Sequence, residues 1–190
     1  MKEHKGYQRR YLRAPYKQEV LYTNGDLVFK GRAKNISEGG ILFEQIGQFF
    51  EKENLDFMIK LPEYPLFKNY DLEKLQKFNV ENFSVRIIRF QARIVRTIEV
   101  DAEQFKSLKT KIALEIMRIN PFYQAKIAHY VDVFSSNLIY LQVLIDTLEN
   151  DKFNLDKIRL ISQALGYSPS EKISMLRQYV EHDYKSLQWL

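Results

Sequence analysis

The chain has 190 residues, of which 45% are hydrophobic and 28% charged, a length and composition typical of a folded protein with a sizeable core. It contains no cysteine, which excludes disulfides and thiolate metal sites, and no apolar run approaches the roughly 20 residues of a membrane span. Together with the polar N-terminus, these features lead us to expect a cytoplasmic protein. The net charge of +5 favours anionic partners, and residues 1–17 alone hold six lysines and arginines against one glutamate.

The first half of the chain reads as β-structure. Alternating apolar and β-branched residues predict strands over 17–23 and 27–36, joined by a hairpin turn at Asn24-Gly25-Asp26, where Asn-Gly favours positive φ. The same alternation predicts four further strands, over 41–44, 55–62, 83–100 and 109–119.

Two parts of this β region depart from simple alternation. The run over 83–100 continues so long without a turn signal that we expect a bend or a bulge in it. Residues 63–82 follow Pro62 and contain Pro65, and their stretch after Asp71 has the N-cap and apolar spacing of a short helix. We therefore expect an insertion between strands at 63–82.

From Asn120-Pro121 onward the pattern becomes helical, with an N-cap asparagine ahead of a first-turn proline. Seven apolar residues then follow at steps of four and three: Ile127, Val131, Phe134, Leu138, Leu141, Ile145 and Leu148. Such a seam fits a coiled coil between subunits or a helix buried in a bundle with residues 154–190. Further apolar residues widen the face, which favours the bundle, with a monomer or a dimer both open.

Two shorter helices are predicted after the long one. The first covers 155–165 and ends at Gly166, and the second covers 168–190, opening at Ser168-Pro169 with a capping-box spacing from Ser168 to Glu171. The sequence of residues 161–177 is similar to a helix-turn-helix motif, but Gly166 lies too close to the predicted start of the next helix for the usual turn. The order is therefore all β followed by all α, which is an α+β fold.

The stretch RRYLR, residues 9–13, places three arginines in five positions. A guanidinium is a planar fork of donors that pairs with phosphate or with a guanine edge, and it also stacks on bases. Taken alone, the stretch fits a solvated basic tail, a nucleic-acid arm, or half of an anion site.

A second polar motif, KNISEGG, occupies residues 34–40. Asn35 and Ser37 are two apart, so in an extended strand they share a face, while Gly39 and Gly40 allow a tight turn and the close approach of a ligand. Taken alone, this motif also fits an ordinary polar turn between strands.

The two motifs together resemble the PilZ family of bacterial receptors for the second messenger cyclic di-GMP. The resemblance rests on RxxxR at Arg9 and Arg13 and on (D/N)xSxxG at Asn35, Ser37 and Gly40, and it covers residues 7–119. It implies a six-stranded antiparallel β-barrel whose N-terminal arm wraps over the ligand.

This resemblance organises the chain into three parts and assigns a site. We expect a flexible arm over 1–15, a barrel over 16–119 that includes the 63–82 insertion, and a C-terminal helical module over 120–190. The implied contacts to cyclic di-GMP come from seven residues: Arg9, Arg10, Arg13, Asn35, Ser37, Gly39 and Gly40.

Within this implied site, the outer arginine pair holds phosphates and guanine edges, Arg10 is a secondary contact, and the asparagine and serine hydrogen-bond a guanine. Gly40 keeps the turn open to the base. Asn35 stands where an aspartate is commoner, and Ala113 stands where many members have glycine in the last strand.

Other chemistry has little support in the sequence. His4, His129 and His182 lack ligand-like spacing, and there is no P-loop, nucleophile elbow or dinucleotide fingerprint. The arginines at 86, 89, 93 and 96 fall on both parities of a strand, which favours a solvated barrel exterior. We therefore predict neither an enzyme nor a cofactor or metal site.

The predicted function is that of a bacterial cyclic di-GMP receptor. Ligand closes the arm, and the C-terminal helices present a changed surface to a protein partner, in the regulation of motility or biofilm formation. Two alternatives remain open: an interaction adaptor that does not bind nucleotide, and a nucleic-acid-binding protein that uses the same basic arm.

Overall fold

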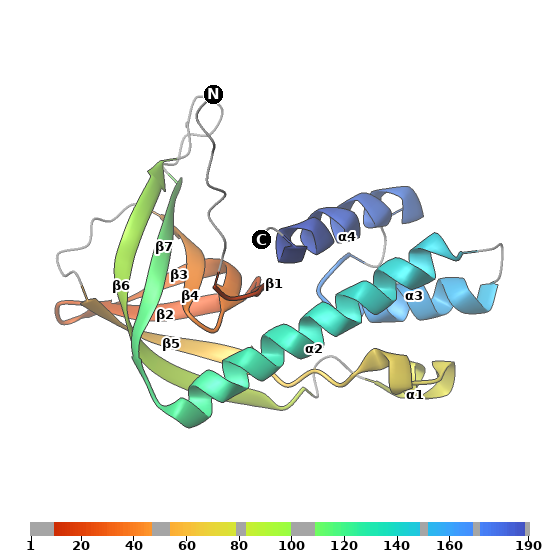
Figure 1. Ribbon diagram of the computed structural model, residues 1–190, viewed down its shortest axis with the longest axis horizontal. Coiled ribbons are helices and arrows are strands. Elements are labelled where there is room, and N and C mark those ends of the chain that lie inside the picture. The colour runs from red at the N-terminus through yellow and green to blue at the C-terminus, as the bar shows by residue number, and fades with distance from the viewer. Residues whose placement is uncertain are drawn as a thin grey trace.

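The computed structural model describes residues 10–46, 54–78, 83–99, 109–148, 152–168 and 172–188. Its strands are β1 (Arg13–Pro15), β2 (Glu19–Asn24), β3 (Leu27–Ser37), β4 (Gly40–Ile46), β5 (Asn54–Pro62), β6 (Val85–Glu99) and β7 (Lys109–Ile119). Its helices are the 3₁₀ turn η1 (Phe67–Asn69), α1 (Leu72–Lys77), α2 (Pro121–Asp146), α3 (Lys152–Ala164) and α4 (Ile173–Gln188). The barrel lies at one end of the molecule and the helices at the other, with α2 running between them (Figure 1).

Six strands close the barrel. The order is β1-β3-β2-β5-β6-β7-β4, and β4 also pairs with β3, so that strands β2 to β7 form a ring in which every pairing is antiparallel. This confirms the predicted fold class. The seventh strand, β1, was not predicted; it pairs antiparallel with the end of β3.

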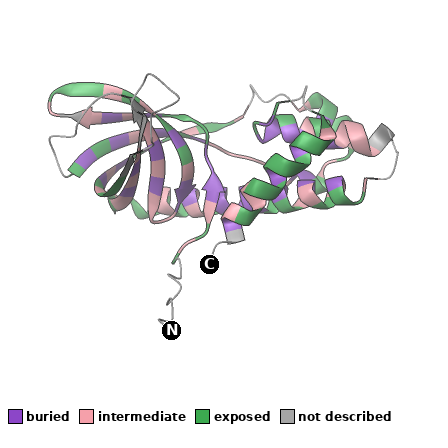
Figure 2. Cartoon of the chain, turned by 90° about the horizontal axis from the view of Figure 1, so that it is seen from above, coloured by how far each residue is buried: buried purple, intermediate pink, exposed green. Residues whose placement is uncertain are grey.

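Aromatic rings fill the barrel interior. Phe57 lies at its centre, with ring centroids 5.7 Å from Tyr22, 5.7 Å from Phe43 and 5.6 Å from Phe90. All four side chains are buried, and Figure 2 shows buried and exposed positions alternating along the strands. These rings form the packed core of the barrel.

The β2–β3 hairpin forms where predicted, but its loop is one residue shorter than the predicted turn. Asn24 pairs with Leu27 and therefore ends β2, which leaves Gly25-Asp26 as the two-residue loop. Among the described residues of this loop only Gly25 has positive φ, at 64°. A positive φ at the first loop residue alone is the type II′ arrangement, whereas Asn-Gly as loop residues would have required positive φ at both.

Register shifts interrupt the strand pairing. Between Ile94 and Arg96 the extra residue is Val95 of β6, which confirms the predicted irregularity of this long strand, whereas at Gln91 and Ala92 the extra residue is Met117 of β7. A further shift falls in β3, between Ala33 and Asn35. This second location was not predicted, and it lies inside the KNISEGG motif.

Helix α2 begins as predicted and is covered within the chain. The Asn120 side chain accepts a hydrogen bond from the Phe122 amide at 2.9 Å, and Pro121 occupies the first turn. Its predicted apolar seam is buried from Ile127 to Ile145. One part of α2 packs on β1, β3 and β5 and another on α3 and α4, which is the intramolecular packing that we favoured.

The two C-terminal helices differ in how well their ends were predicted. Helix α3 ends as expected at Gly166, whose φ is +85°; the Gly166 amide donates to Gln163 O and the Tyr167 amide to Ser162 O, a Schellman motif. The predicted start of the last helix was wrong. Helix α4 begins at Ile173, and Lys172 O accepts hydrogen bonds from the Met175 and Leu176 amides, so the helix starts five residues after Ser168.

The 63–82 insertion contains the expected short helix. Asp71 caps α1 by accepting from the Lys74 amide at 2.8 Å, and α1 packs against α3 beside the helical module. Asn79 to Asn82 lie outside the described residues. No helix among the residues described is long and apolar enough to cross a membrane.

Candidate functional site

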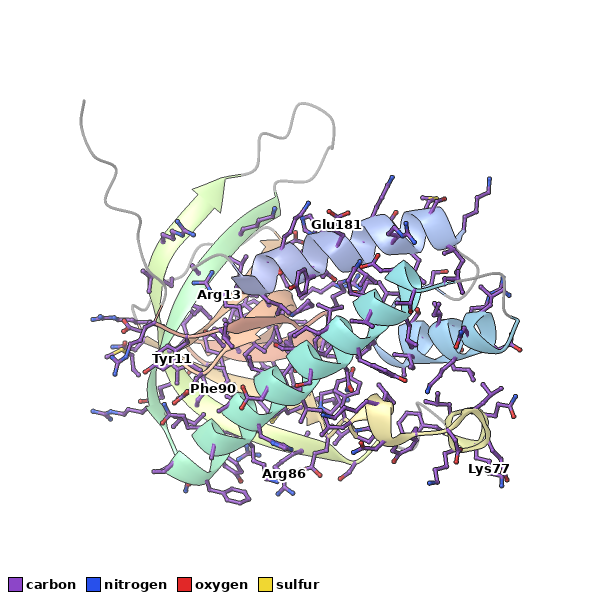
Figure 3. The ribbon with its side chains drawn as sticks, turned by 45° about the vertical axis from the view of Figure 1, so that its right-hand side comes forward. Tyr11, Arg13, Lys77, Arg86, Phe90 and Glu181 are labelled. Carbon is purple, nitrogen blue, oxygen red and sulfur yellow. The ribbon has the colours of Figure 1, made fainter. Side chains whose placement is uncertain are left out.

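Strand β1 brings the two sequence motifs together. Arg13 pairs with Ser37, and Pro15 pairs with Asn35, so the last arginine of RxxxR lies directly across from the polar residues of KNISEGG. Arg13 is half-buried, and Figure 3 shows it at the strand beside the end of α4. Arg9 lies outside the described residues.

The register shift in β3 decides which way the motif faces. Ala33 pairs with Phe43 and Asn35 with Leu42, which leaves Lys34 as the extra residue of a bulge. Ala33 and Ile36, three residues apart, are both fully buried. The alternation after the bulge therefore places Asn35 and Ser37 on the side opposite the core, where regular pairing would have turned them into it.

The turn between β3 and β4 is stabilised by a hydrogen bond within the turn and by another from strand β7. Ser37 Oγ donates to Gly40 O at 3.2 Å, and the Ile116 amide of β7 donates to Gly39 O at 3.0 Å. The Ser37 side chain is 6% exposed. These contacts fix the turn before any ligand arrives.

The two glycines of the turn face different neighbours. A Cβ on Gly39 would lie 2.7 Å from two ring carbons of Tyr11, and a Cβ on Gly40 would overlap the Leu114 carbonyl oxygen. Gly39 thus leaves room for the arm, and Gly40 allows β4 to approach the β7 backbone. Sequence reasoning had assigned Gly40 a role toward the ligand and had not singled out Tyr11.

The described part of the arm stacks on this turn. The Arg10 guanidinium lies 5.2 Å from the centroid of the Tyr11 ring, within the range of a cation–π contact. Arg10 is exposed and Tyr11 half-buried against Gly39. The Arg10 guanidinium, the Tyr11 ring and the Gly39 backbone are therefore stacked in this order at the end of β3.

Two buried tyrosines anchor the arm where it joins the barrel. Tyr16 OH donates to Lys60 O at 2.6 Å, and Tyr130 OH of α2 donates to Pro15 O at 2.9 Å. Burial raises the pKa of both phenols, so both remain neutral hydrogen-bond donors around neutral pH. Nothing in the local sequence pattern marked Tyr130 as a partner of the arm.

Charged residues on the neighbouring strands are largely paired. Arg93 Nη2 lies 2.7 Å from Glu115, which itself pairs across from Gly40, and Arg86 binds Glu63. The hydrogen bond from Arg86 is the main reason that the pKa of Glu63 is lowered. Arg89 and Arg96 are exposed, in agreement with the predicted solvated exterior.

The side chains at this site are suited to binding a ligand through hydrogen bonds and charge. Guanidinium groups, an amide and a hydroxyl meet at one end of β3, which suits an anion with hydrogen-bonding edges. In the described ranges no three or more histidines and carboxylates lie together as metal ligands would. His129 and His182 are both exposed, and His4 lies outside the described residues.

A comparison with known families decides the classification. The sequence pattern of the family described as PilZ domain matches residues 7–132, about two thirds of the chain. The chain belongs to the PilZ domain family. The match contains both motifs and the whole barrel of this PilZ protein, and it ends inside α2, so α3 and α4 lie beyond it.

Solved structures similar to this PilZ protein share low sequence identity with it. The inhibitor of motility MotI (DgrA) of Bacillus subtilis is 22% identical, with 66% of this chain and 50% of that one covered and a TM-score of 0.49. The PilZ domain of YcgR from Escherichia coli, with c-di-GMP, is 13% identical, with 74% and 99% covered and a TM-score of 0.44.

PlzA of Borreliella burgdorferi, in complex with c-di-GMP, is 10% identical, with 73% of this chain and 54% of that one covered and a TM-score of 0.42. The match thus spans about half the length of the Bacillus and Borreliella chains. No curated protein sequence matches this chain. Family membership therefore rests on the domain match.

Proposed function

We propose that this PilZ protein is a bacterial receptor for cyclic di-GMP. The observation that carries the proposal is the register of β1 on β3, which sets Arg13 across from Ser37 and Pro15 across from Asn35. Two motifs that are separate in sequence thereby form one surface, and that surface offers groups suited to a guanine nucleotide.

The chemistry of the ligand matches these groups. Cyclic di-GMP carries two phosphodiester charges and two flat purines, so its site needs planar cations and partners for guanine edges. Arginine supplies bidentate contacts to both phosphate and guanine O6/N7. The Asn35 amide offers donor and acceptor together, and Ser37 Oγ, which donates to Gly40 O, keeps acceptor capacity for a guanine N–H.

The proposed site consists of the seven motif residues: Arg9, Arg10, Arg13, Asn35, Ser37, Gly39 and Gly40. Ligand binding would close the part of the arm ahead of β1 over the barrel and change the surface that the helical module offers to a protein partner. This assigns the protein to signalling by binding, without catalysis.

Isothermal titration calorimetry with cyclic di-GMP tests the proposal. Wild type should bind saturably, and Arg9→Ala with Arg13→Ala should abolish binding, because the paired guanidiniums neutralise the phosphates. The control is Arg89→Ala with Arg96→Ala, which removes the same two charges from the exposed outside of β6 and should leave binding unchanged.

Two results would contradict the proposal. The absence of binding by wild type would favour the adaptor interpretation. Tight binding of duplex DNA that survives both arginine changes would favour the nucleic-acid interpretation.

A further inference from the structure

The segment that follows RxxxR is tied to β3 without interruption. After β1, the Tyr16 amide donates to Lys34 O at 3.0 Å, and Gln18 O accepts from the Ala33 amide at 2.9 Å. Lys17 lies between these two hydrogen bonds and four residues after Arg13. A contact that fixes the position of the Lys17 side chain therefore also helps to fix the position of β1, which carries Arg13.

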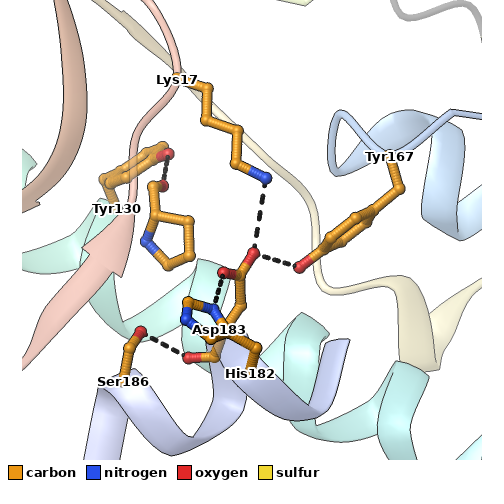
Figure 4. Close-up of polar contacts among 7 residues, drawn as sticks. Lys17, Tyr130, Tyr167, His182, Asp183 and Ser186 are labelled. Carbon is orange, nitrogen blue, oxygen red and sulfur yellow. Dashed lines mark hydrogen bonds and ion pairs between the residues drawn. The ribbon is translucent and has the colours of Figure 1, made fainter. Parts of the chain in front are cut away.

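Lys17 is held by residues from the C-terminal helices (Figure 4). Its Nζ lies 3.5 Å from Asp183 Oδ2 of α4 and 4.9 Å from the centroid of the Tyr167 ring. Tyr167 OH donates to the same Asp183 oxygen at 2.7 Å. One carboxylate thus joins the segment after β1, the loop after α3 and helix α4.

The surroundings of Asp183 favour a defined geometry. Its side chain is 14% exposed, against 46% for Lys17, so the pair is better shielded than a surface ion pair. His182 Nδ1 lies 3.3 Å from the other carboxylate oxygen of Asp183, while Ser186 Oγ donates to the backbone carbonyl oxygen of the same residue. The carboxylate is therefore contacted by three side chains, those of Lys17, Tyr167 and His182.

Helix α4 is itself fixed on the core and touches β1. Leu176, Val180 and Leu187 are buried, and α4 packs against β1 and α2. Asp183 and Tyr167 both lie beyond the residues that match the PilZ family. The contact is thus an addition that this chain makes to the domain.

We infer that Asp183 is a positioning residue for the nucleotide site, acting through Lys17 to hold β1 on β3 and so to orient Arg13. This inference rests on the proposed function. Coupling between two sites is reciprocal, so nucleotide binding stabilises the docking of α4 on β1 as much as docked α4 strengthens nucleotide binding. The C-terminal helix is then the element whose docking the nucleotide changes.

Calorimetry on substituted chains tests the link to the ligand. Asp183→Asn keeps an acceptor for Tyr167 but removes the charge that faces Lys17, and we expect binding of cyclic di-GMP to weaken about five-fold or more. Glu181→Gln is the matched control, because Glu181 lies exposed on the same helix and pairs with Lys185. The exchanged pair Lys17→Glu with Asp183→Lys should recover part of the lost affinity, because it restores the ion pair but not the hydrogen bond from Tyr167.

Hydrogen exchange without nucleotide tests the link to the arm. The Tyr16 amide should exchange faster in Asp183→Asn than in wild type, while the Glu63 amide, which donates to Ser84 O just before β6 and away from the turn at Gly39, should not change. Wild-type affinity together with wild-type Tyr16 exchange in Asp183→Asn would overturn the inference. If wild type binds no nucleotide, the proposed function and the nucleotide part of the inference both fail, and faster Tyr16 exchange would still support positioning of β1 by α4.

Discussion

At the scale of single residues, two adjacent glycines of one motif serve different neighbours. The space beside Gly39 is taken by the Tyr11 ring of the arm, a side chain that can move. The space beside Gly40 is taken by the Leu114 carbonyl, which belongs to the backbone of β7 and cannot move without disturbing the barrel. Gly39 therefore makes room for the arm, and Gly40 makes room for the pairing of β4 with β7.

This difference gives a prediction for stability. Gly40→Ala should lower the free energy of unfolding by about 1–3 kcal/mol, since its Cβ overpacks against backbone. Gly39→Ala, the matched control, should cost less, since Tyr11 can shift. Urea denaturation measures both, and equal stability of Gly40→Ala and wild type would show that β4 and β7 are not held so closely.

At the scale of elements, one polar residue in the apolar face of α2 fastens the insertion. Asn137 is 1% exposed; its Oδ1 accepts from the Phe67 amide at 2.9 Å, and its Nδ2 donates to Pro65 O at 2.8 Å. Both partners belong to the chain that leads into η1. The 63–82 insertion is thus docked on α2 by hydrogen bonds as well as by the buried Phe67.

Removing that side chain should be costly. Asn137→Ala leaves a buried amide and a carbonyl without their partner, and we expect a loss of about 2 kcal/mol or more in the free energy of unfolding. Ser136→Ala, at the exposed neighbouring position, should change it little. The comparison is made by chemical denaturation, and similar midpoints for the two variants would contradict the assigned role.

At the scale of the whole molecule, barrel and helices share one core. Buried apolar residues form a continuous cluster from Ala14 of β1, along α2, to Leu187 of α4. Helix α2 belongs to both halves, because it packs on the barrel and on α3 and α4. Neither half can be exposed without uncovering apolar surface of the other.

We therefore expect one cooperative unfolding transition. The far-UV circular dichroism of the helices and the near-UV signal of the buried aromatic side chains should change at the same urea concentration. Ile145→Ala, a cavity where α2 lies among the helices, should move both transitions together. A helical signal lost at lower urea than the aromatic signal would indicate two independent units.

The sequence predicted those features that depend on local periodicity and local chemistry. Alternation placed the barrel strands, Asn120 and Gly166 marked helix ends, and the two motifs indicated the family. Strand β1 was missed because three residues that include Pro15 show no alternation. The start of α4 was misplaced because a capping sequence such as that at Ser168 is a local signal, which does not by itself fix where a helix begins. The contact of Lys17 with Asp183 was beyond reach, because it joins distant segments that only tertiary packing brings together.

The bulge at Lys34 has a consequence for transferring the motif between proteins. The bulge reverses the alternation of β3. Before Lys34 the odd-numbered residues such as Ala33 face the core, and after it the even-numbered Ile36 does. If only Asn35 to Gly40 were copied onto a regular strand, the alternation of the host strand would decide which face Asn35 and Ser37 occupy. The portable unit of this site therefore begins at Ala33, together with the residue that the pairing leaves out.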